Sequence, residues 1–538
     1  MTDKTTDKTS RFASAIAATP WGIDAHRVQI EVDSRQGMPA MNLVGLPDAA
    51  VKESRERVRA AIRNAHFDLP YRSVTISLAP ADLRKEGNLL DLAIALALLA
   101  AFGHLPQEAL DRRVICGELG LDGKIKPVRG GLALAELTRR LGKDELILPA
   151  ANAAEAAALE SGPVIGVETL LEAVEYLQGH RPLAAARPGT ADPSRTGHPD
   201  FAEVKGQEGA KRALEIAAAG GHNLLLIGPP GSGKTMLARR VPGILPHLER
   251  GEAIAITKIT SLNGARSPGG LLVERPFRSP HTQTSTAGMI GGGSVPRPGE
   301  VSLAHTGVLF LDELPEFRRD TLEALRQPME DGQVSIARAR ARFTFPCRFM
   351  LLAAMNPCPC GHLGDPRHAC ECPGPMIDRY RARVSGPLLD RIDLHVEVPV
   401  PSLGELKSGP GTGSDDMAER VDAARARQRK RFRGAATPPV NAAMGPGTTR
   451  RVCPLDAAAQ VLLDRAYEQL GLSARALDRV LKVSRTIADL AGRDTIDVGH
   501  VAEAIQYRAL DRRSAPSAAH ARGSTARADR SLRRAGGG

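Results

Sequence analysis

The chain contains 538 residues, has an aromatic fraction of only 3% and carries a formal net charge of +11. The length predicts two to four domains, since compact domains usually span about 100–200 residues. No apolar run approaches the roughly 20 residues that cross a bilayer, and residues 1–8 lead into no apolar core, so we expect neither a membrane protein nor a secretory signal. We therefore expect a cytoplasmic protein, and its excess of positive charge favours a polyanionic partner.

The first part of the chain predicts an α+β domain over residues 22–181, after a disordered segment at 1–21. Alternating apolar residues indicate strands, and apolar residues that recur on one face indicate helices, the first of them capped by Asp48. The expected strands lie at 22–33, 42–45, 73–78, 114–117 and 145–148, and the expected helices at 48–64, 89–101 and 132–141. Residues 182–200, rich in Pro, Ala, Gly and Ser, indicate a linker.

Two segments of this domain resemble Lon-type protease domains and the related domain of the DNA-repair protein RadA. Residues 117–131 are similar to the segment that carries the Lon catalytic lysine, and residues 80–91 to the segment that carries the serine. The resemblance implies a Lon-protease-like fold, also called ribosomal protein S5 domain 2-like. The serine position falls near Leu89 and the lysine position at Ala133 or Ala135, and aliphatic side chains supply neither nucleophile nor base. We therefore expect an inactive scaffold or a platform that faces DNA.

A phosphate-binding loop marks the second predicted domain, residues 201–401. The apolar run 224–227 predicts a buried strand, which breaks directly into a glycine-rich loop followed by a helical pattern. The predicted loop consists of Gly228, Pro229, Pro230, Gly231, Ser232, Gly233, Lys234 and Thr235. Its backbone N–H groups can point at phosphates, while Lys234 reaches the β- and γ-phosphates and Thr235 holds Mg²⁺. The cofactors expected are ATP and Mg²⁺, with residues 204–207 near the adenine.

Two further strand ends are predicted to complete the ATPase site. The apolar run 308–311 ends in Asp312 and Glu313. A buried parallel strand would deliver Asp312 to the Mg²⁺ shell and Glu313 to the attacking water as general base. Asn356 follows the apolar run 349–355 and is placed to orient the same water.

Two segments of the second domain carry basic residues suited to a nucleic acid. Residues 276–300 are rich in Gly, Pro, Ser and Thr, and a loop of this length inside a compact domain is usually functional. After an expected helix at 319–330, Asp331 and Gly332 signal a turn, and the residues around them predict a basic hairpin that projects into a pore. The expected phosphate contacts are Arg278, His281 and Arg297 in the loop and Arg338, Arg340 and Arg342 in the hairpin. A solvated loop and an exposed charged hairpin are the alternatives.

Four of the seven cysteines are Cys358, Cys360, Cys370 and Cys372. This clustering favours a metal site in a reducing compartment over a disulfide framework, and four thiolates suit tetrahedral structural Zn²⁺. Each pair has the tight Cys-x-Cys spacing, so His362 or His368 can replace one ligand. Reduced thiols that pack a loop are the alternative.

Several arginines lie near the end of the chain. Arg391 closes a predicted helix before the last strand of the second domain, where it can act on a neighbouring subunit's nucleotide as an arginine finger or form a surface salt bridge. Arg475 opens a later helix and suits a lid arginine facing the γ-phosphate, whereas Arg479 and Arg485 are expected at surfaces or partner contacts. The remaining segments are a linker with a charged helix at 402–450, a small helical lid domain at 451–511 and a disordered basic tail at 512–538.

Taken in order, these motifs match an AAA+ ATPase, and further stretches at 44–59, 298–317, 354–361 and 385–394 are similar to the ComM/YifB family of magnesium-chelatase-like ATPases. The resemblance extends from Gly22 to Arg512. It implies a multidomain α/β protein with a parallel-sheet ATPase core and a helical lid. It also implies a homo-hexameric helicase that drives branch migration of DNA during natural transformation, with single-stranded or branched DNA and recombination proteins as partners.

Two other functions remain open at the level of sequence. The ATPase subunit of magnesium chelatase, which the second domain also resembles, is a motor that acts on a protein partner. The added N-terminal domain and the positive net charge weigh against this alternative. An ATP-dependent protease is the third class, and it lacks a nucleophile at Leu89 and a base at Ala133.

Overall fold

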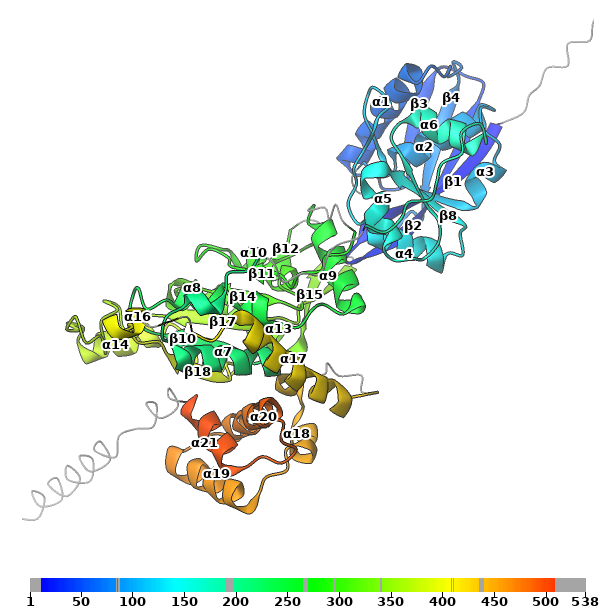
Figure 1. The fold of residues 1–538 in the computed structure, drawn as a ribbon. Coiled ribbons are helices and arrows are strands. Elements are labelled where there is room, and N and C mark those ends of the chain that lie inside the picture. Colours follow the sequence, from blue (N-terminus) through cyan, green and yellow to red (C-terminus); the bar gives the residue numbers. More distant parts are fainter. Residues whose placement is uncertain are drawn as a thin grey trace, which may run out of the picture.

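The structure is a computed structural model that describes residues 11–83, 85, 88–189, 197–264, 270–293, 296–338, 341–407, 409, 411–434 and 440–508. Figure 1 shows an N-terminal sheet domain in blue and cyan, a central sheet domain mainly in green, and a helical region that ends in orange and red. Within these residues, no helix is both long enough and apolar enough to cross a membrane. The protein is therefore a mixed α/β protein with several domains.

The N-terminal domain is built on a seven-stranded mixed sheet in the order β3-β4-β2-β1-β5-β8-β9. Its strands are β1 (Arg11–Trp21), β2 (Asp24–Arg35), β3 (Ala40–Val44), β4 (Ser73–Ala79), β5 (Arg113–Ile115), β8 (Glu145–Pro149) and β9 (Val164–Val167), with a small pair formed by β6 (Glu118–Leu119) and β7 (Ile125–Lys126). Its helices are α1 (Ala49–Asn64), α2 (Asp91–Ala101), α3 (Glu108–Asp111), α4 (Gly131–Arg140), α5 (Ala150–Ala157) and α6 (Leu170–Leu177).

The central strand of this sheet is β1, so the prediction of disorder over residues 1–21 is wrong for residues 11–21. β1 pairs antiparallel with β2 along its whole length and parallel with β5. Its sequence is rich in alanine, which has a weak preference for strands, and this hid the strand from pattern analysis. The small side chains of Ala15 and Ala17 are nevertheless buried in the core. Residues 1–10 lie outside the described part of the chain.

The positions that match the Lon catalytic residues are buried among apolar side chains. The exposed fractions of Leu89, Ala133 and Ala135 are 6%, 3% and 1%. Nearby, α1 begins directly after Asp48, whose carboxylate accepts a hydrogen bond from the N–H of Val51 at 2.7 Å, as predicted for its N-cap. Aliphatic side chains at these buried positions supply neither a nucleophile nor a base.

The central domain is organised around a five-stranded parallel sheet in the order β11-β14-β17-β10-β18. These strands are β10 (Leu224–Ile227), β11 (Phe277–Arg278), β14 (Val308–Leu311), β17 (Met350–Met355) and β18 (Leu394–Glu397). The helices around them are α7 (Glu208–Gly220), α8 (Lys234–Ala238), α9 (Arg250–Leu262), α10 (Thr286–Ile290), α11 (Glu300–Leu303), α12 (Arg319–Ala324), α13 (Arg326–Asp331), α14 (Gly374–Arg381), α15 (Gly386–Leu389) and α16 (Leu403–Lys407). Because the strands are parallel, the loops after β10, β14 and β17 meet at one end of the sheet.

Short elements complete the central domain. They are two antiparallel pairs, β12 (Gly291–Gly292) with β13 (Arg297–Pro298) and β15 (Gln333–Arg338) with β16 (Ala341–Pro346), and the 3₁₀ turns Phe201–Glu203, Val241–Ile244 and Leu314–Glu316. The predicted helix 319–330 is divided into α12 and α13 because Pro328 has no N–H to donate to the carbonyl of Ala324. Asp331 and Gly332 end α13, with Gly332 at φ 63°, and are not the turn of the hairpin. β15 and β16 pair as far as Arg338 and Ala341, and residues 339–340 lie outside the described residues.

The helical region consists of α17 (Ser414–Arg431), α18 (Pro446–Val452), α19 (Ala457–Leu470), α20 (Ala474–Leu490) and α21 (Val498–Gln506), with a 3₁₀ turn at Asn441–Ala443. The helix α17 contacts both α7 and α20 and buries Met417, Val421 and Ala424. The charged helix expected at 415–432 is confirmed as α17, but it is packed core, so the interpretation of 402–450 as a linker is wrong for this helix. The four helices that follow, drawn below the sheet in Figure 1, correspond to the expected lid domain, and we call them the lid.

The N-terminal domain rests on the central domain through α9 and the β15–β16 hairpin. The N–H of Gly130 donates to Ser261 Oγ at 3.0 Å, and Lys258 forms an ion pair with Glu136. The rings of Trp21 and Phe343 lie 4.8 Å apart between centroids. The first strand of the N-terminal domain is therefore in direct contact with the hairpin of the ATPase core.

Candidate nucleotide site

The loop after β10 has the backbone that phosphate binding requires. β10 is fully buried between β17 and β18, and the chain turns sharply at its end. A Cβ on Gly228 would lie 2.2 Å from the carbonyl oxygen of Val398, so only glycine fits there. Gly231 and Gly233 have φ angles of 74° and 92°, which other residues rarely adopt. The loop then enters α8 at Lys234, two residues before Met236, where the helical pattern of the sequence begins.

Lys234 connects the phosphate loop to the end of the neighbouring strand, β17. Its ammonium group donates hydrogen bonds to the carbonyl oxygens of Gly228 at 2.6 Å and Pro229 at 2.9 Å, and to Asn356 Oδ1 at 3.3 Å. Burial lowers the pKa of Lys234, against the opposing effect of Asp312 and Glu313. A phosphate group placed here would supply the negative charge that this desolvated cation lacks.

The Mg²⁺ ligands expected from the sequence are in direct contact. Thr235 Oγ1 donates to Asp312 Oδ2 at 2.6 Å, although the two residues follow different strands. The second oxygen of Asp312 accepts the N–H of Glu313 at 3.0 Å. A hydroxyl and a carboxylate are oxygen ligands of the kind that Mg²⁺ prefers, so this pair fits the ion as the expected cofactor.

Glu313 leaves β14 in a strained conformation. Its φ and ψ angles are 51° and 48°, in the left-handed region, which costs a non-glycine residue roughly 1–3 kcal/mol and is enriched at active sites. The side chain is exposed at the end of the strand, next to Asp312. This geometry leaves its carboxylate accessible to a water molecule, as the role of general base requires.

On the other side of the loop, Gln207 fixes the segment that was expected near the adenine. Its φ angle is 61°, and its Nε2 donates to the carbonyl oxygens of Ser232 at 3.3 Å and of Pro399. It thereby ties the start of α7 to the phosphate loop and to the residues after β18. Residues 204–207 therefore lie beside the phosphate loop.

Arg391 lies at the opposite end of the sheet. Its backbone carbonyl accepts a hydrogen bond from Asn223 Nδ2 at 3.0 Å, and Asn223 directly precedes β10. Its guanidinium forms an ion pair with Glu330 and donates to the carbonyl oxygen of Pro387 at 2.5 Å. In the described residues, the Nε atom of Arg391 is buried without a hydrogen-bond partner. Arg391 is therefore directed away from the phosphate loop of its own chain.

The lid also docks at this amino end of the strands. His222, two residues before β10, contacts Asp393 through Nδ1 at 3.2 Å and Thr486 of α20 through Nε2 at 2.8 Å. Arg479, expected at a surface, is only 15% exposed and lies 3.4 Å from Asp393, which precedes β18. The sequence analysis missed this junction, because its residues are separated by up to 264 positions.

Arg475 lies on the first turn of α20, one turn before Arg479, and is exposed. Because α20 docks at the amino end of the sheet, Arg475 is not brought to Lys234 of the same chain.

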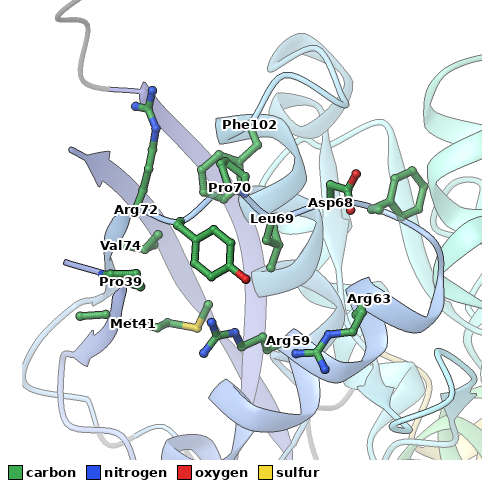
Figure 2. A pocket seen from close by; sticks show the side chains of 13 residues that line it. Pro39, Met41, Arg59, Arg63, Asp68, Leu69, Pro70, Arg72, Val74 and Phe102 are labelled. Atoms are coloured by element: carbon green, nitrogen blue, oxygen red, sulfur yellow. The ribbon is translucent and has the colours of Figure 1, made fainter. Parts of the chain in front are cut away.

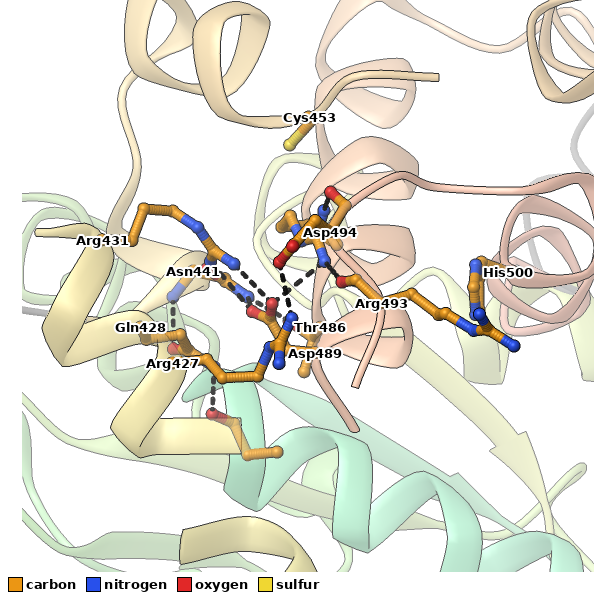
Figure 3. Close-up of polar contacts among 12 residues, drawn as sticks. Arg427, Gln428, Arg431, Asn441, Cys453, Thr486, Asp489, Arg493, Asp494 and His500 are labelled. Carbon is orange, nitrogen blue, oxygen red and sulfur yellow. Dashed lines mark hydrogen bonds and ion pairs between the residues drawn. The ribbon is translucent and has the colours of Figure 1, made fainter. Parts of the chain in front are cut away.

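Arg485, which was also expected at a surface, is fully buried, and that expectation is wrong. It is 1% exposed, and its guanidinium pairs with Asp489 at 3.0 Å and donates to the carbonyl oxygens of Arg493 and Asp494. Figure 3 shows Arg431 and Asn441 converging on the same Asp489 carboxylate from the other side. Arg485 thus ties the end of α20 to the residues that follow it, and Asp489 connects α20 to α17 through Arg431.

The four cysteines form one cluster beside the phosphate loop. The Sγ atom of Cys358 lies 3.4 Å from that of Cys360 and 3.6 Å from that of Cys370, and all four sulfurs are within 4.8 Å of one another. A hydrogen bond from the backbone of His362 lowers the pKa of Cys360 to about 6. Four sulfurs at these distances could hold a metal ion.

The two histidines do not replace a cysteine in this cluster. His362 and His368 instead flank the carboxylate of Asp365, at 3.5 and 3.1 Å. These three residues form a second group with metal-ligating atoms. The interpretation of either histidine as a substitute ligand is therefore not supported, since the thiols already provide a complete set of four.

The residues expected to contact nucleic acid differ in their availability. Arg278 makes two hydrogen bonds to Glu300, at 2.7 and 2.9 Å, so its charge is already neutralised. His281 and Arg297 are exposed. Arg342 lines a cleft of about 570 Å³ between the N-terminal and central domains. The side chain of Arg338 and all of Arg340 lie outside the described residues.

Comparisons with known proteins agree with this geometry. The family model described as magnesium chelatase, subunit ChlI, matches residues 200–406, and related ChlI models match residues 30–152 and 411–508. The fold, the phosphate loop and these matches define a magnesium-chelatase-like ATPase of the AAA+ class.

Relatives that match over nearly the whole chain identify the family within this class. The chain is 45% identical to the uncharacterized protein YifB of Escherichia coli and 44% identical to the competence protein ComM of Haemophilus influenzae. Each alignment covers 91% of this chain and 96% of the relative. The chain therefore belongs to the ComM/YifB family. A further match, 32% identical over 28% of this chain, is the DNA replication licensing factor mcm-5 of Caenorhabditis elegans.

Proposed function

We propose that this protein is an ATP-driven DNA motor, a homo-hexameric helicase that drives branch migration during recombination or natural transformation. The observation that carries the proposal is the division of the ATPase machinery between the two ends of one sheet. Lys234, Thr235 and Asp312 lie at the carboxyl end, whereas Arg391 and the lid lie at the amino end. Such a chain completes its site only when the amino end of one copy meets the carboxyl end of the next. This is a head-to-tail contact, which forms a ring when the rotation between successive copies closes.

In this arrangement the residues have separate tasks. Lys234 and the loop N–H groups hold the phosphates, while Thr235 and Asp312 would hold Mg²⁺, which supplies charge neutralisation when bound. Glu313 takes a proton from the attacking water, and Asn356 orients it. Arg391 of the neighbouring copy, after leaving Glu330, would stabilise charge on the transferred phosphoryl group, with Arg475 beside it.

Several observations support DNA as the partner. The net charge is +11, and Arg297 and Arg342 lie in the two segments expected to meet a nucleic acid. One relative is named a competence protein, and a shorter match is a DNA replication licensing factor. A motor that uses both ATP and DNA works where both are present, so we keep the cytoplasm as its proposed location.

The deciding experiment measures ATP turnover and junction unwinding together. We expect turnover by the wild type to rise when single-stranded or branched DNA is added, and to lose that stimulation steeply as salt is raised. Glu313→Gln should bind ATP and DNA but neither hydrolyse nor unwind. Turnover that ignores DNA at every salt concentration would contradict a DNA motor while leaving the ATPase assignment intact.

A motor that acts on a protein partner is the second candidate, because all three matching family models describe the ChlI subunit of magnesium chelatase. Its distinguishing result is ATP turnover that is indifferent to DNA and is stimulated by a partner protein instead. The same turnover assay therefore separates the two candidates.

We further propose that the cysteine cluster holds structural Zn²⁺. The Sγ–Sγ distances of 3.4, 3.6 and 3.7 Å are close to the edge of a tetrahedron with Zn–S bonds of about 2.3 Å, which is about 3.8 Å. The loop also packs on the phosphate loop, since a Cβ on Gly361 would lie 2.6 Å from Pro230. A bound ion would therefore hold the chain that follows Asn356 against the nucleotide site.

Metal analysis of the purified protein tests this proposal directly. We expect about one zinc per chain in the wild type and loss of zinc in Cys360→Ser/Cys370→Ser. Cys116→Ser, at a buried cysteine in the N-terminal domain, is the matched control and should retain the metal. The site would be refuted if the wild-type protein is purified without zinc and does not bind added zinc. ATP affinity that is unchanged by a chelator would then also be expected.

A further inference from the structure

A groove on the N-terminal domain, distant from the phosphate loop, has no role in the function proposed so far. It lies where α1, the loop before β4 and the strand β3 meet, and β3 is the outermost strand of the sheet. Its volume is about 300 Å³, at the lower limit of the roughly 300–1,000 Å³ typical of ligand pockets. Among its lining residues are Met41, Arg59, Arg63, Phe67, Tyr71 and Arg72. We call it the Tyr71 groove.

The lining of the Tyr71 groove carries three arginines against one carboxylate, Asp68, so an excess of positive charge remains. Arg59 and Arg63 lie one turn apart on α1, and Arg72 borders the groove from the opposite side (Figure 2). Among the described residues, no carboxylate forms an ion pair with any of these three. Other arginines of α1 are paired, for example Arg57 with Asp91 at 2.9 Å. The three guanidinium groups are therefore available to an anionic ligand, and guanidinium suits phosphate.

The groove also offers an aromatic surface. Tyr71 is 85% exposed, a high value for a large side chain that is mostly apolar. Next to it, Phe67, Leu69 and Phe102 line the groove with apolar surface. An exposed ring among unpaired arginines matches the two chemical parts of a nucleotide, because the ring can stack on a base while the arginines contact phosphates.

From this combination we infer that the Tyr71 groove binds single-stranded DNA, one base stacking on Tyr71 and the flanking phosphates contacting Arg59, Arg63 and Arg72. Duplex DNA presents no free base face to a side chain of this kind, so the groove selects a single strand. The inference rests on the proposed DNA motor and adds to it a contact outside the ATPase core. Such a contact would hold a displaced strand on the N-terminal domain while the ATPase core moves along DNA.

The experiment compares two labelled strands of equal length, oligo(dT) and an abasic deoxyribose-phosphate strand, in fluorescence anisotropy with the full-length protein. Tyr71→Ala should lower the affinity for oligo(dT) about 10-fold and leave the affinity for the abasic strand unchanged, because only stacking is lost. Arg59→Glu/Arg63→Glu should weaken the binding of both strands. It should also reduce the slope of log K against log salt concentration by about 1.4. ATP turnover without DNA should not change in either variant.

Tyr467→Ala and Arg465→Glu provide matched controls, since both residues are exposed on α19. Photocrosslinking of a 5-iododeoxyuridine strand, followed by mass spectrometry, should place the adduct on Tyr71. The inference would be overturned if the wild type binds oligo(dT) without an adduct in residues 67–72 and Tyr71→Ala binds it with unchanged affinity. The proposed DNA motor would not be affected by this result. Wild-type protein that binds neither strand would overturn the DNA motor itself, so the two failures are distinct.

Discussion

The two ends of the parallel sheet in the central domain are organised in opposite ways. At the carboxyl end, side chains from three strands already touch, with Thr235 Oγ1 at 2.6 Å from Asp312 and Lys234 Nζ at 3.3 Å from Asn356. At the amino end, Arg391 is held by Glu330 and the lid is fixed by buried polar contacts. One chain thus preassembles the phosphate-binding half of the proposed site, whereas its candidate arginine finger lies on the other side of the sheet.

The largest effect should come from removing the arginine at the amino end. Arg391→Ala is expected to lower ATP turnover by about 10³–10⁵-fold, the range known for arginine fingers, without weakening ATP binding. Mixing it with Lys234→Ala subunits should restore part of the turnover, because some interfaces then combine an intact Lys234 with a neighbour's intact Arg391. Steady-state hydrolysis over a series of mixing ratios measures this. Absence of rescue at all ratios would place the action of Arg391 within its own chain.

At the carboxyl end, Glu313→Gln should reduce turnover by about 10²–10⁴-fold, the usual contribution of a general base. ATP affinity should remain near that of the wild type, because the amide keeps the shape of the side chain and Lys234 is untouched. Single-turnover hydrolysis and binding of a fluorescent ATP analogue provide the two readouts. If Glu316→Gln, three residues further along the chain, had an equal effect, the assignment of the base to Glu313 would be lost.

Asp489 is the residue whose substitution should remove the buried polar contacts that hold α20 against α17. This residue is 0% exposed and compensates the buried guanidinium of Arg485, so Asp489→Ala should destabilise the protein by about 3–5 kcal/mol. Asp494→Ala is the control, because Asp494 is 95% exposed in its ion pair with Arg427 and should cost no more than about 1 kcal/mol. Thermal unfolding of both variants tests the difference. Equal melting temperatures would mean that the buried network adds nothing to the docking of the lid.

The packing at the amino end of the sheet should also lose more stability in acid than the carboxyl end. Burial lowers the pKa of His305, just before β14, to about 4, and its Nδ1 accepts the N–H of Arg348 at 3.0 Å. Since the unfolded histidine has a pKa near 6.5, the stability that its neutral form contributes is complete above pH 6.5. It is lost as pH falls towards 4, by at most about 3 kcal/mol.

Urea unfolding between pH 7 and pH 4.5 measures this loss. His305→Gln should make the curve less steep, because an amide has no charge to gain, although it can reduce stability at pH 7. Part of the fall should remain, since burial also lowers the pKa of His395 in β18, to about 3. His180→Gln, at an exposed position, should leave the curve as in the wild type. A wild-type curve that does not fall below pH 6.5 would show that protonation of His305 is not coupled to unfolding.

The phosphate-binding half could be predicted from sequence because each of its residues follows an apolar strand within a few positions. The runs before Gly228, Asp312 and Asn356 are short and buried, and they fix both the strand and the residue at its end. The parallel order of the strands then brings these ends together. The contacts of Lys234 and Thr235 follow from this local information.

The amino end could not be predicted in the same way. The junction of His222, Asp393 and Thr486 joins three segments distant in the chain, and no local pattern specifies that they meet. Arg485 was placed at a surface because charged residues are rarely buried, and its pairing with Asp489 overrides that tendency. The strand β1 was missed for a related reason, since burial between two neighbouring strands compensates for its weak local preference.

The contact between Trp21 and Phe343 has a practical consequence. The chain contains a single tryptophan, and its ring lies 4.8 Å from a side chain of the β15–β16 hairpin. Tryptophan emission, excited at wavelengths that the five tyrosines do not absorb, therefore reports on one place only, the contact between the first strand and the ATPase core. If ATP turnover displaces the hairpin, the surroundings of the indole ring will change with each displacement. The emission of Trp21 will then follow the movement of the hairpin without an added dye.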